Sequence, residues 1–168
     1  MQKFLKIALS FVILFVLIVA VQFVLKTIQK EDEQKNEQAQ ANIPPEQLKQ
    51  QLMSTISDKV LNEFLDNIIL NIQIDPQNNR ANVTLSLQAN EFLNENTLLK
   101  DSYNLFTALQ HETAINQLTL KWHMLVQNAN TEVLSIQMDG NLLADMETIS
   151  YQEIPNIALS YKKNSNLK

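Results

Sequence analysis

The chain of 168 residues has no cysteine and a single glycine, and these two shortages exclude several classes of protein. Without cysteine there is no disulfide, no thiolate metal site, no cysteine nucleophile and no lipid-modified cysteine near the N-terminus. Walker A and GxGxxG nucleotide loops need several glycines within one short stretch, and the GxSxG elbow of serine hydrolases needs two. The sequence therefore excludes most nucleotide-dependent enzymes and hydrolases of this kind.

Basic residues are few outside the N-terminus. Residues 1–30 contain four lysines and no acidic residue, whereas residues 31–168 contain nine basic residues and all eighteen acidic ones. Because a nucleic-acid-binding domain needs a basic face, we predict no nucleic-acid partner. Twelve lysines against one arginine, together with nineteen asparagines, favour a low-GC bacterium with a single membrane as the source.

An apolar segment near the N-terminus predicts a membrane anchor. The nineteen residues from Ile7 to Leu25 carry no charge, and as a helix they extend roughly 28 Å, close to the ~30 Å hydrocarbon core of a bilayer. A cleaved signal peptide is one alternative, but the run is long for that and no small-x-small cleavage pattern follows it. A buried core helix is the other, but a helix that is apolar on all sides has no partner in so small a domain. We predict residues 1–26 to be a transmembrane anchor with a short cytoplasmic N-terminus.

The segments beside the anchor bear on its orientation. Lysines flank both ends of the apolar run, so the positive-inside count is nearly balanced. Six residues precede the run and more than 140 follow it, which favours a signal anchor of a single-pass protein whose C-terminal domain is extracytoplasmic. Residues 27–44 contain no aromatic residue and bury little apolar surface, so we predict a polar stalk or linker there.

Hydrophobic periodicity predicts an α+β domain over residues 45–161. An amphipathic helix is expected over Glu46–Asp66, and a second helix over Thr97–His111. Period-two alternation on both sides of a turn predicts one β-hairpin over residues 68–88 and another over residues 118–138. The order helix, strand, strand, helix, strand, strand suits a four-stranded antiparallel sheet covered on one face by helices.

The apolar stripe of the first predicted helix has two interpretations. It recurs every four residues and is widened by Met53, Leu61 and Leu65; its members are Leu48, Leu52, Ile56, Val60 and Phe64. A stripe of this kind either covers the sheet of its own domain or offers a surface to a partner helix. The sheet predicted immediately after it favours the first interpretation.

Beyond Gly140 the apolar residues follow neither the helical repeat nor the two-residue alternation of a strand for long. The segment is too apolar for a free tail, so we predict a short helix or an extended wrap that packs on the body and bends at Pro155. Residues 162–168 are polar and contain three lysines. We predict a solvated, basic C-terminal tail there.

The second face of the predicted sheet is rich in neutral hydrogen-bonding groups. If the alternation holds, Trp122 points to the core and the opposite face carries Asn82, Thr84, Ser86, Gln88, Thr119, Lys121, His123, Ser135 and Gln137. This candidate interaction face is either simply solvated or a docking surface for protein or glycan. Amides and hydroxyls bind either partner without the desolvation cost of charged groups.

Catalytic patterns are incomplete. His111-Glu112 begins like the HExxH motif of zinc proteases, but the second histidine position is Ile115. Asp139 and Asp145 could form a carboxylate pair of the glycosidase kind, yet any chain with this many acids contains such pairs. We therefore predict no enzyme activity, no catalytic residue, no metal site and no cofactor.

These observations together favour a non-enzymatic, membrane-anchored assembly protein. The order of elements behind an anchor resembles the small ring-building or pseudopilus-adjacent domains of bacterial envelope machines, a likeness of topology without a shared motif. The leading hypothesis is a scaffolding component of a conjugation, secretion, sporulation or division complex. The alternative is a sensory or ligand-binding module that recognises cell-wall glycan or peptide. Expected partners are the lipid bilayer and membrane or envelope proteins, with a homo-oligomer left open.

Overall fold

The computed structural model describes residues 43–64, 66–90 and 92–167. The predicted anchor (1–26) and all but the last two residues of the predicted stalk (27–44) lie outside these described residues, so both stay predictions. Among the described residues, no helix has the length and apolar character needed to cross a membrane. The described residues from Pro44 onward belong to one compact unit.

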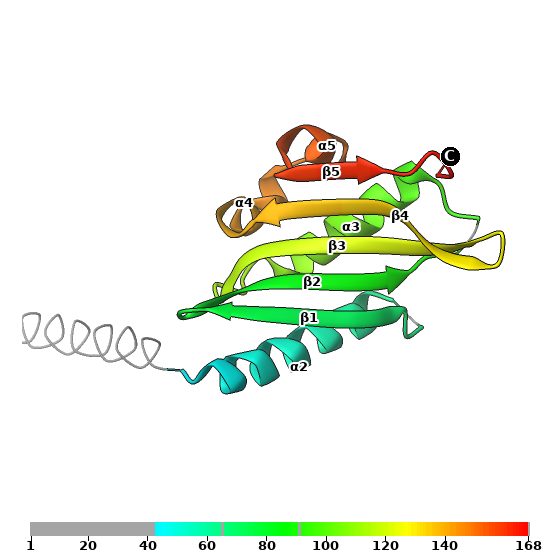
Figure 1. Cartoon of the computed structure of the whole chain (residues 1–168). Helices are drawn as coiled ribbons and strands as arrows, with labels where there is room; N and C mark the ends of the chain where they lie inside the picture. The colour runs from blue at the N-terminus through cyan, green and yellow to red at the C-terminus, as the bar shows by residue number, and fades with distance from the viewer. Residues whose placement is uncertain (1–42, 65, 91, 168) are drawn as a thin grey trace, which may run out of the picture. The chain divides into compact units, whose positions relative to one another are not determined.

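Five strands form one mixed sheet in the order β1-β2-β3-β4-β5 (Figure 1). They are β1 (Ile69–Gln77), β2 (Arg80–Gln88), β3 (Ile115–Val126), β4 (Ala129–Asp139) and β5 (Ser160–Lys163). The α+β class and both hairpins are confirmed, because β1 pairs antiparallel with β2 and β3 pairs antiparallel with β4. The prediction of a four-stranded antiparallel sheet is wrong on two counts. Strand β5 adds a fifth strand, and β2 pairs parallel with β3.

The parallel pairing of β2 and β3 follows from helix α3 (Glu95–Leu109), which connects them. A helix that packs lengthwise on a sheet carries the chain back to the end where the preceding strand began. Strand β3 therefore starts beside the start of β2, with Ala81 opposite Ile115, and runs in the same direction. The sequence prediction treated the two hairpins as separate units and therefore missed the crossover connection from β2 through α3 to β3.

Both hairpins close through tight turns with left-handed backbone. Asn78 has φ of 57° in the first turn, and Gln127 and Asn128 have φ of 51° and 65° in the second. Positive φ at these positions matches the right-handed twist of the flanking strands, and asparagine tolerates it better than most residues. The first turn consists of Asn78 and Asn79 alone, since β1 ends at Gln77 and β2 begins at Arg80.

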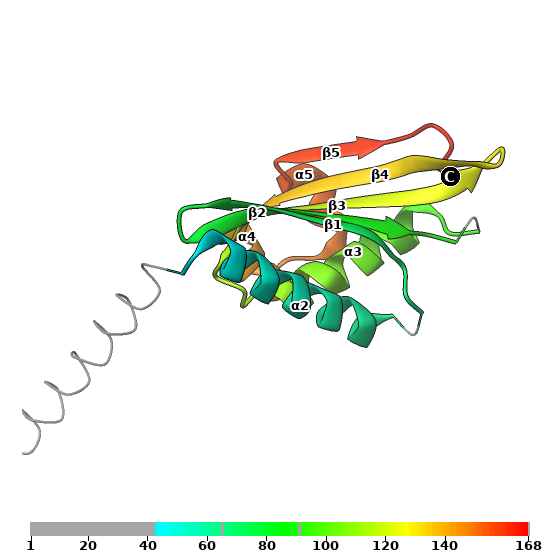
Figure 2. The same cartoon turned by 60° about the horizontal axis from the view of Figure 1, so that its bottom comes forward.

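Helix α2 (Pro45–Glu63) contacts β1 and α3 and lies beside α3 on the same face of the sheet (Figure 2). Its first turn accepts a proline because the N–H there needs no helical partner. The predicted stripe packs inside the domain, where its buried members are Leu48, Leu52, Ile56 and Val60. Met53 and Leu61 do not widen the stripe, since they are 39% and 50% exposed. Leu65 lies outside the described residues.

Helix α3 begins and ends two residues before the predicted bounds, and it is capped at its N-terminus. The Asn94 side chain accepts a hydrogen bond from the Thr97 backbone N–H at 3.0 Å, which satisfies one free donor of the first turn. The helix buries an apolar face against the sheet. Within that face, the Ser102 hydroxyl donates to the Leu98 carbonyl oxygen at 2.6 Å and accepts from Trp122 Nε1 at 2.8 Å. The inward orientation predicted for Trp122 is thereby confirmed.

The chain after β4 forms short helices and then the fifth strand. These helices are α4 (Gly140–Ala144), η1 (Met146–Thr148), η2 (Tyr151–Glu153) and α5 (Ile154–Ile157), of which η1 and η2 are single 3₁₀ turns. They pack on the body as the predicted wrap required. The solvated tail predicted for residues 162–168 is wrong in part: Lys162 and Lys163 belong to β5, and Leu167 is only 4% exposed.

Strand β5 is tied to α3 through one carboxylate. The Tyr161 hydroxyl donates to Glu95 Oε1 at 2.6 Å, and Lys163 Nζ donates to Glu95 Oε2 at 2.7 Å. The bond from Lys163 and then the bond from Tyr161 hold the pKa of Glu95 below its usual value. Burial and the adjacent carboxylate raise the pKa of Tyr161. The folded state therefore favours an ionised Glu95 and a neutral Tyr161.

This cluster makes stability depend on pH in a defined direction. Because the unfolded chain protonates Glu95 at a higher pH than the folded chain does, the stabilisation is present above the ordinary glutamate pKa and is lost as the pH falls through the folded value. We expect Glu95→Gln to cost about 1 kcal/mol at neutral pH and to flatten this acid loss. Urea midpoints measured between about pH 3 and pH 7 test it, with exposed Glu46→Gln as the control. Parallel curves for the wild type and Glu95→Gln would contradict it.

Candidate interaction face

The structure places all nine residues of the candidate interaction face on the side of the sheet opposite α2 and α3. Each is half-buried and alternates along its strand with a buried core residue. The nine are Asn82, Thr84, Ser86, Gln88, Thr119, Lys121, His123, Ser135 and Gln137. We call this surface the polar face. Its proposed role in docking stays a prediction.

Strand register arranges the polar face in rows that run across the sheet. In the central row Thr84 lies opposite Thr119, which lies opposite Gln137. The row is completed at its two ends by Gln73 of β1 and Ser160 of β5. All five side chains are uncharged, and together they cross the whole width of the sheet.

The flanking rows carry charge at several positions that the sequence prediction left out. On one side of the central row the sequence of partners across the sheet is Asn71, Ser86, Lys121, Ser135 and Lys162. On the other side it is Asp75, Asn82, Gln117 and Asp139. The sequence prediction included no residue of β1, although the alternation along that strand could have identified its members. Those of β5 had no comparable signal, because that strand is four residues long.

Several side chains of the polar face form hydrogen bonds or an ion pair with neighbouring side chains. Gln137 Nε2 donates to Gln117 Oε1 at 2.9 Å, and Lys121 Nζ lies 3.2 Å from Glu132 Oε2. Asn82 accepts from the Asn116 side chain at 2.9 Å. Hydroxyl groups near the centre have no such bond to protein among the described residues, and they are those of Thr84, Ser86, Thr119 and Ser135. These hydroxyls keep their donor and acceptor capacity for another molecule.

The imidazole of His123 is less accessible to solvent than that of an ordinary surface histidine. Its Nε2 atom is closed off from solvent and has no hydrogen-bond partner within the described part of the chain. Register places it opposite Glu132, but that carboxylate pairs with Lys121. His123 therefore has no carboxylate partner of its own among the described residues.

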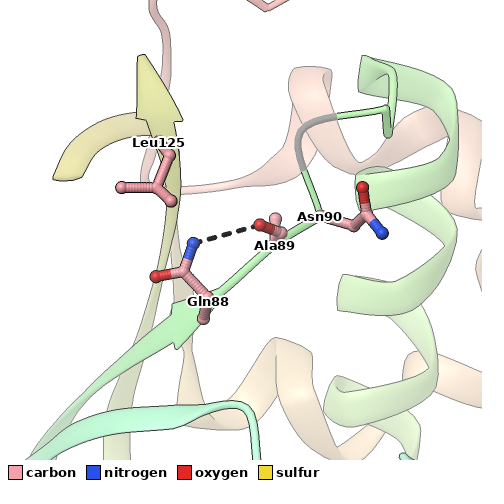
Figure 3. A pocket seen from close by; sticks show the side chains of 4 residues that line it. All are labelled: Gln88, Ala89, Asn90 and Leu125. Carbon is pink, nitrogen blue, oxygen red and sulfur yellow. Dashed lines mark hydrogen bonds between the residues drawn. The ribbon is translucent and has the colours of Figure 1, made fainter. Parts of the chain in front are cut away.

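A shallow pocket lies where β2 ends beside β3. It has a volume of about 290 Å³ and is lined by Gln88, Ala89, Asn90 and Leu125 (Figure 3). Gln88 Nε2 donates to the Ala89 carbonyl oxygen and to the His123 carbonyl oxygen, at 3.1 Å each. Leu125 follows His123 on the polar face and is 58% exposed. The pocket gives one end of the face an apolar edge.

The residues considered for catalysis are not brought together. The Asp139 side chain accepts a hydrogen bond from the Asn141 backbone N–H at 2.8 Å and so caps α4, whereas Asp145 ends that helix. His111 and Glu112 lie in the connection between α3 and β3. Within the residues that the structure describes, no group of three or more His, Asp or Glu side chains is placed to hold a metal ion.

The chemistry at the centre of the polar face is that of neutral hydrogen bonding. Amides and hydroxyls both donate and accept, so the face accommodates backbone groups or sugar hydroxyls alike. The two aromatic residues of the described strands, Trp122 and Tyr161, both contact α3 on the opposite side. The polar face therefore has no aromatic platform for the apolar side of a sugar ring. No family model, curated protein or solved structure matches this chain.

Proposed function

We propose that this chain is a non-enzymatic, single-pass membrane protein whose extracytoplasmic domain is an assembly or scaffolding component of a bacterial envelope machine of the conjugation, secretion, sporulation or division type. The anchor and its orientation rest on the sequence alone. The assembly role is supported by one structural observation, the two-sided character of the sheet. One side is covered by α2, α3 and the short C-terminal helices, and the other is the polar face.

The physical properties of the polar face suit protein docking. A non-obligate protein interface is about as polar as the rest of the surface, and its centre is depleted of charge. The polar face has an uncharged central row and charged residues in the rows beside it. Neutral groups at the centre lose less hydration free energy on contact than charged groups would.

The second candidate function is recognition of cell-wall glycan or peptide. The pocket beside Leu125 favours it, because a small apolar hollow next to amide groups fits a peptide side chain. The absence of aromatic residues from the described strands of the polar face weighs against a glycan. A face that binds isolated wall material and no protein would favour this second function.

A triple substitution on the polar face tests the assembly role. Thr84→Ala, Lys121→Ala and His123→Ala combined should lower the free energy of unfolding by less than about 1.5 kcal/mol, because each side chain lies on the solvent side of the sheet. The same variant of the full chain should lose the envelope proteins that co-purify with the wild type in mild detergent.

The matched control places three alanines on the outer surface of α2. Gln51, Ser54 and Asp58 are exposed there, so their replacement changes the same number of polar side chains away from the polar face. This control should keep the co-purifying proteins. If the polar-face variant is folded, present at the normal level and still fully supports the host process, the docking role of this face is wrong.

A further inference from the structure

Charge divides the polar face into an acidic row and a basic row on the two sides of its uncharged centre. Asp75 and Asp139 belong to the first row, and Lys121 and Lys162 belong to the second. The two rows lie at equal spacing from the central row, because each is two residues away along every strand. A face patterned in this way is complementary to itself when its strand direction is reversed.

We propose that the polar face packs against the same face of a second copy of this chain, with a twofold axis that runs across the strands over the central row. The proposal rests on the docking role given above and names the partner for it. Two sheets pack face to face with their strands nearly aligned, which this axis allows. Such an interface is isologous, since each patch meets an identical patch.

The register places one acidic side chain between two lysines of the other copy. Across this axis Asp139 of the second copy lies over Ser135, because both are two residues from Gln137. Ser135 is the strand partner of Lys121 on one side and of Lys162 on the other. Lys121 already pairs with Glu132, whereas Lys162 has no ion pair among the described residues. The acidic side chain would therefore supply a counter-charge to Lys162.

The central row suits an axis that brings each residue against its own copy. Threonine, serine and glutamine side chains each contain both a donor and an acceptor, so like residues pair without repulsion. A twofold axis parallel to the strands, between β2 and β3, would instead place Asp75 over Asp139 of the other copy. Because like charges directly opposite are destabilising, the axis across the strands is the favoured one.

Thiol cross-linking tests this geometry, since the natural chain has no cysteine. In the full chain in mild detergent, Thr119→Cys lies on the axis and should be joined into a covalent dimer by a short bifunctional maleimide. Ser54→Cys on the outer surface of α2 is exposed and should give no dimer. Equal cross-linking at the two positions, or none at Thr119→Cys, would overturn the proposal.

Charge variants give a second measurement, the dissociation constant of the dimer. Lys162→Glu should raise this constant about tenfold, because two acidic side chains then meet. Combining Lys162→Glu with Asp139→Asn, which keeps the side-chain oxygen that caps α4, should lower the dissociation constant part of the way back to the wild-type value. A chain that stays monomeric while a different envelope protein depends on the polar face would refute the twofold pairing and leave the assembly role standing. A dimer whose dissociation constant is unaffected by Lys162→Glu, alone or combined with Asp139→Asn, would refute the pairing alone.

Discussion

Replacing Trp122 by alanine should lower the free energy of unfolding by about 3 to 5 kcal/mol, enough to unfold many domains of this size. The side chain is 1% exposed and packs edge to face with Phe64, with ring centroids 6.1 Å apart. Its Nε1 donates to the Ser102 hydroxyl, and that hydroxyl donates to a carbonyl oxygen of α3. The substitution therefore leaves a large cavity and removes the bond that joins β3 to α3. Chemical denaturation followed by circular dichroism measures the loss.

Two controls separate the cavity from the hydrogen bond. Trp122→Phe keeps most of the ring and removes the N–H donor, so it should cost about half as much or less. Lys121→Ala, one residue away on the polar face, should cost within roughly 0.5 kcal/mol. If Trp122→Ala is tolerated and Lys121→Ala unfolds the domain, the inward and outward sides of β3 are reversed.

Replacing Gly140 by alanine should also destabilise the domain, by about 1 to 3 kcal/mol, through overpacking. A methyl group added at this position would lie 2.5 Å from the Ile115 carbonyl oxygen and 2.8 Å from that of Asn116. Both atoms belong to the backbone of β3 and cannot rotate away. Arg80 Nη2, which donates to the same Ile115 oxygen at 2.7 Å, would lie 2.7 Å from the methyl group. The single glycine of the chain is thus required where α4 begins against the sheet.

The neighbouring Asn141→Ala is the control for this prediction. Asn141 is exposed, and only its backbone N–H takes part in the cap from Asp139. It should change the free energy of unfolding by less than about 0.5 kcal/mol. Equal thermal midpoints for Gly140→Ala and Asn141→Ala would show that the β3 backbone can shift to make room.

Local periodicity was sufficient to predict the two long helices and both hairpins. The stripe of α2 and the buried side of α3 follow a helical repeat, and the residues from Leu118 to Met124 alternate strictly. These signals depend only on which side of an element meets the core, and the burial of Trp122 between two half-buried neighbours agrees with them. The nine residues of the polar face could be named for the same reason.

Local periodicity could not predict which residues of the polar face lie side by side on neighbouring strands. A register shift between Trp122 and His123 places His123 opposite Glu132, and similar shifts occur in the pairing of β1 with β2 and of β2 with β3. A bulge adds one residue to one strand, and the alternation along that strand does not indicate which residue of the neighbouring strand lies opposite after the bulge. The rows that carry the proposed contacts are therefore a property of the folded sheet.

The class of the fold, the inward side of each long element and the polar character of the opposite face could be predicted, because they depend on the spacing of apolar residues along the chain. The direction of β3, the existence of β5 and the neighbours of each residue across the sheet depend instead on contacts formed in the folded domain. Strand direction depends on how α3 returns the chain. Strand β5 is extended because β4 offers it backbone partners and Glu95 holds Tyr161 and Lys163. These interactions join residues distant in the chain, so no local pattern contains them.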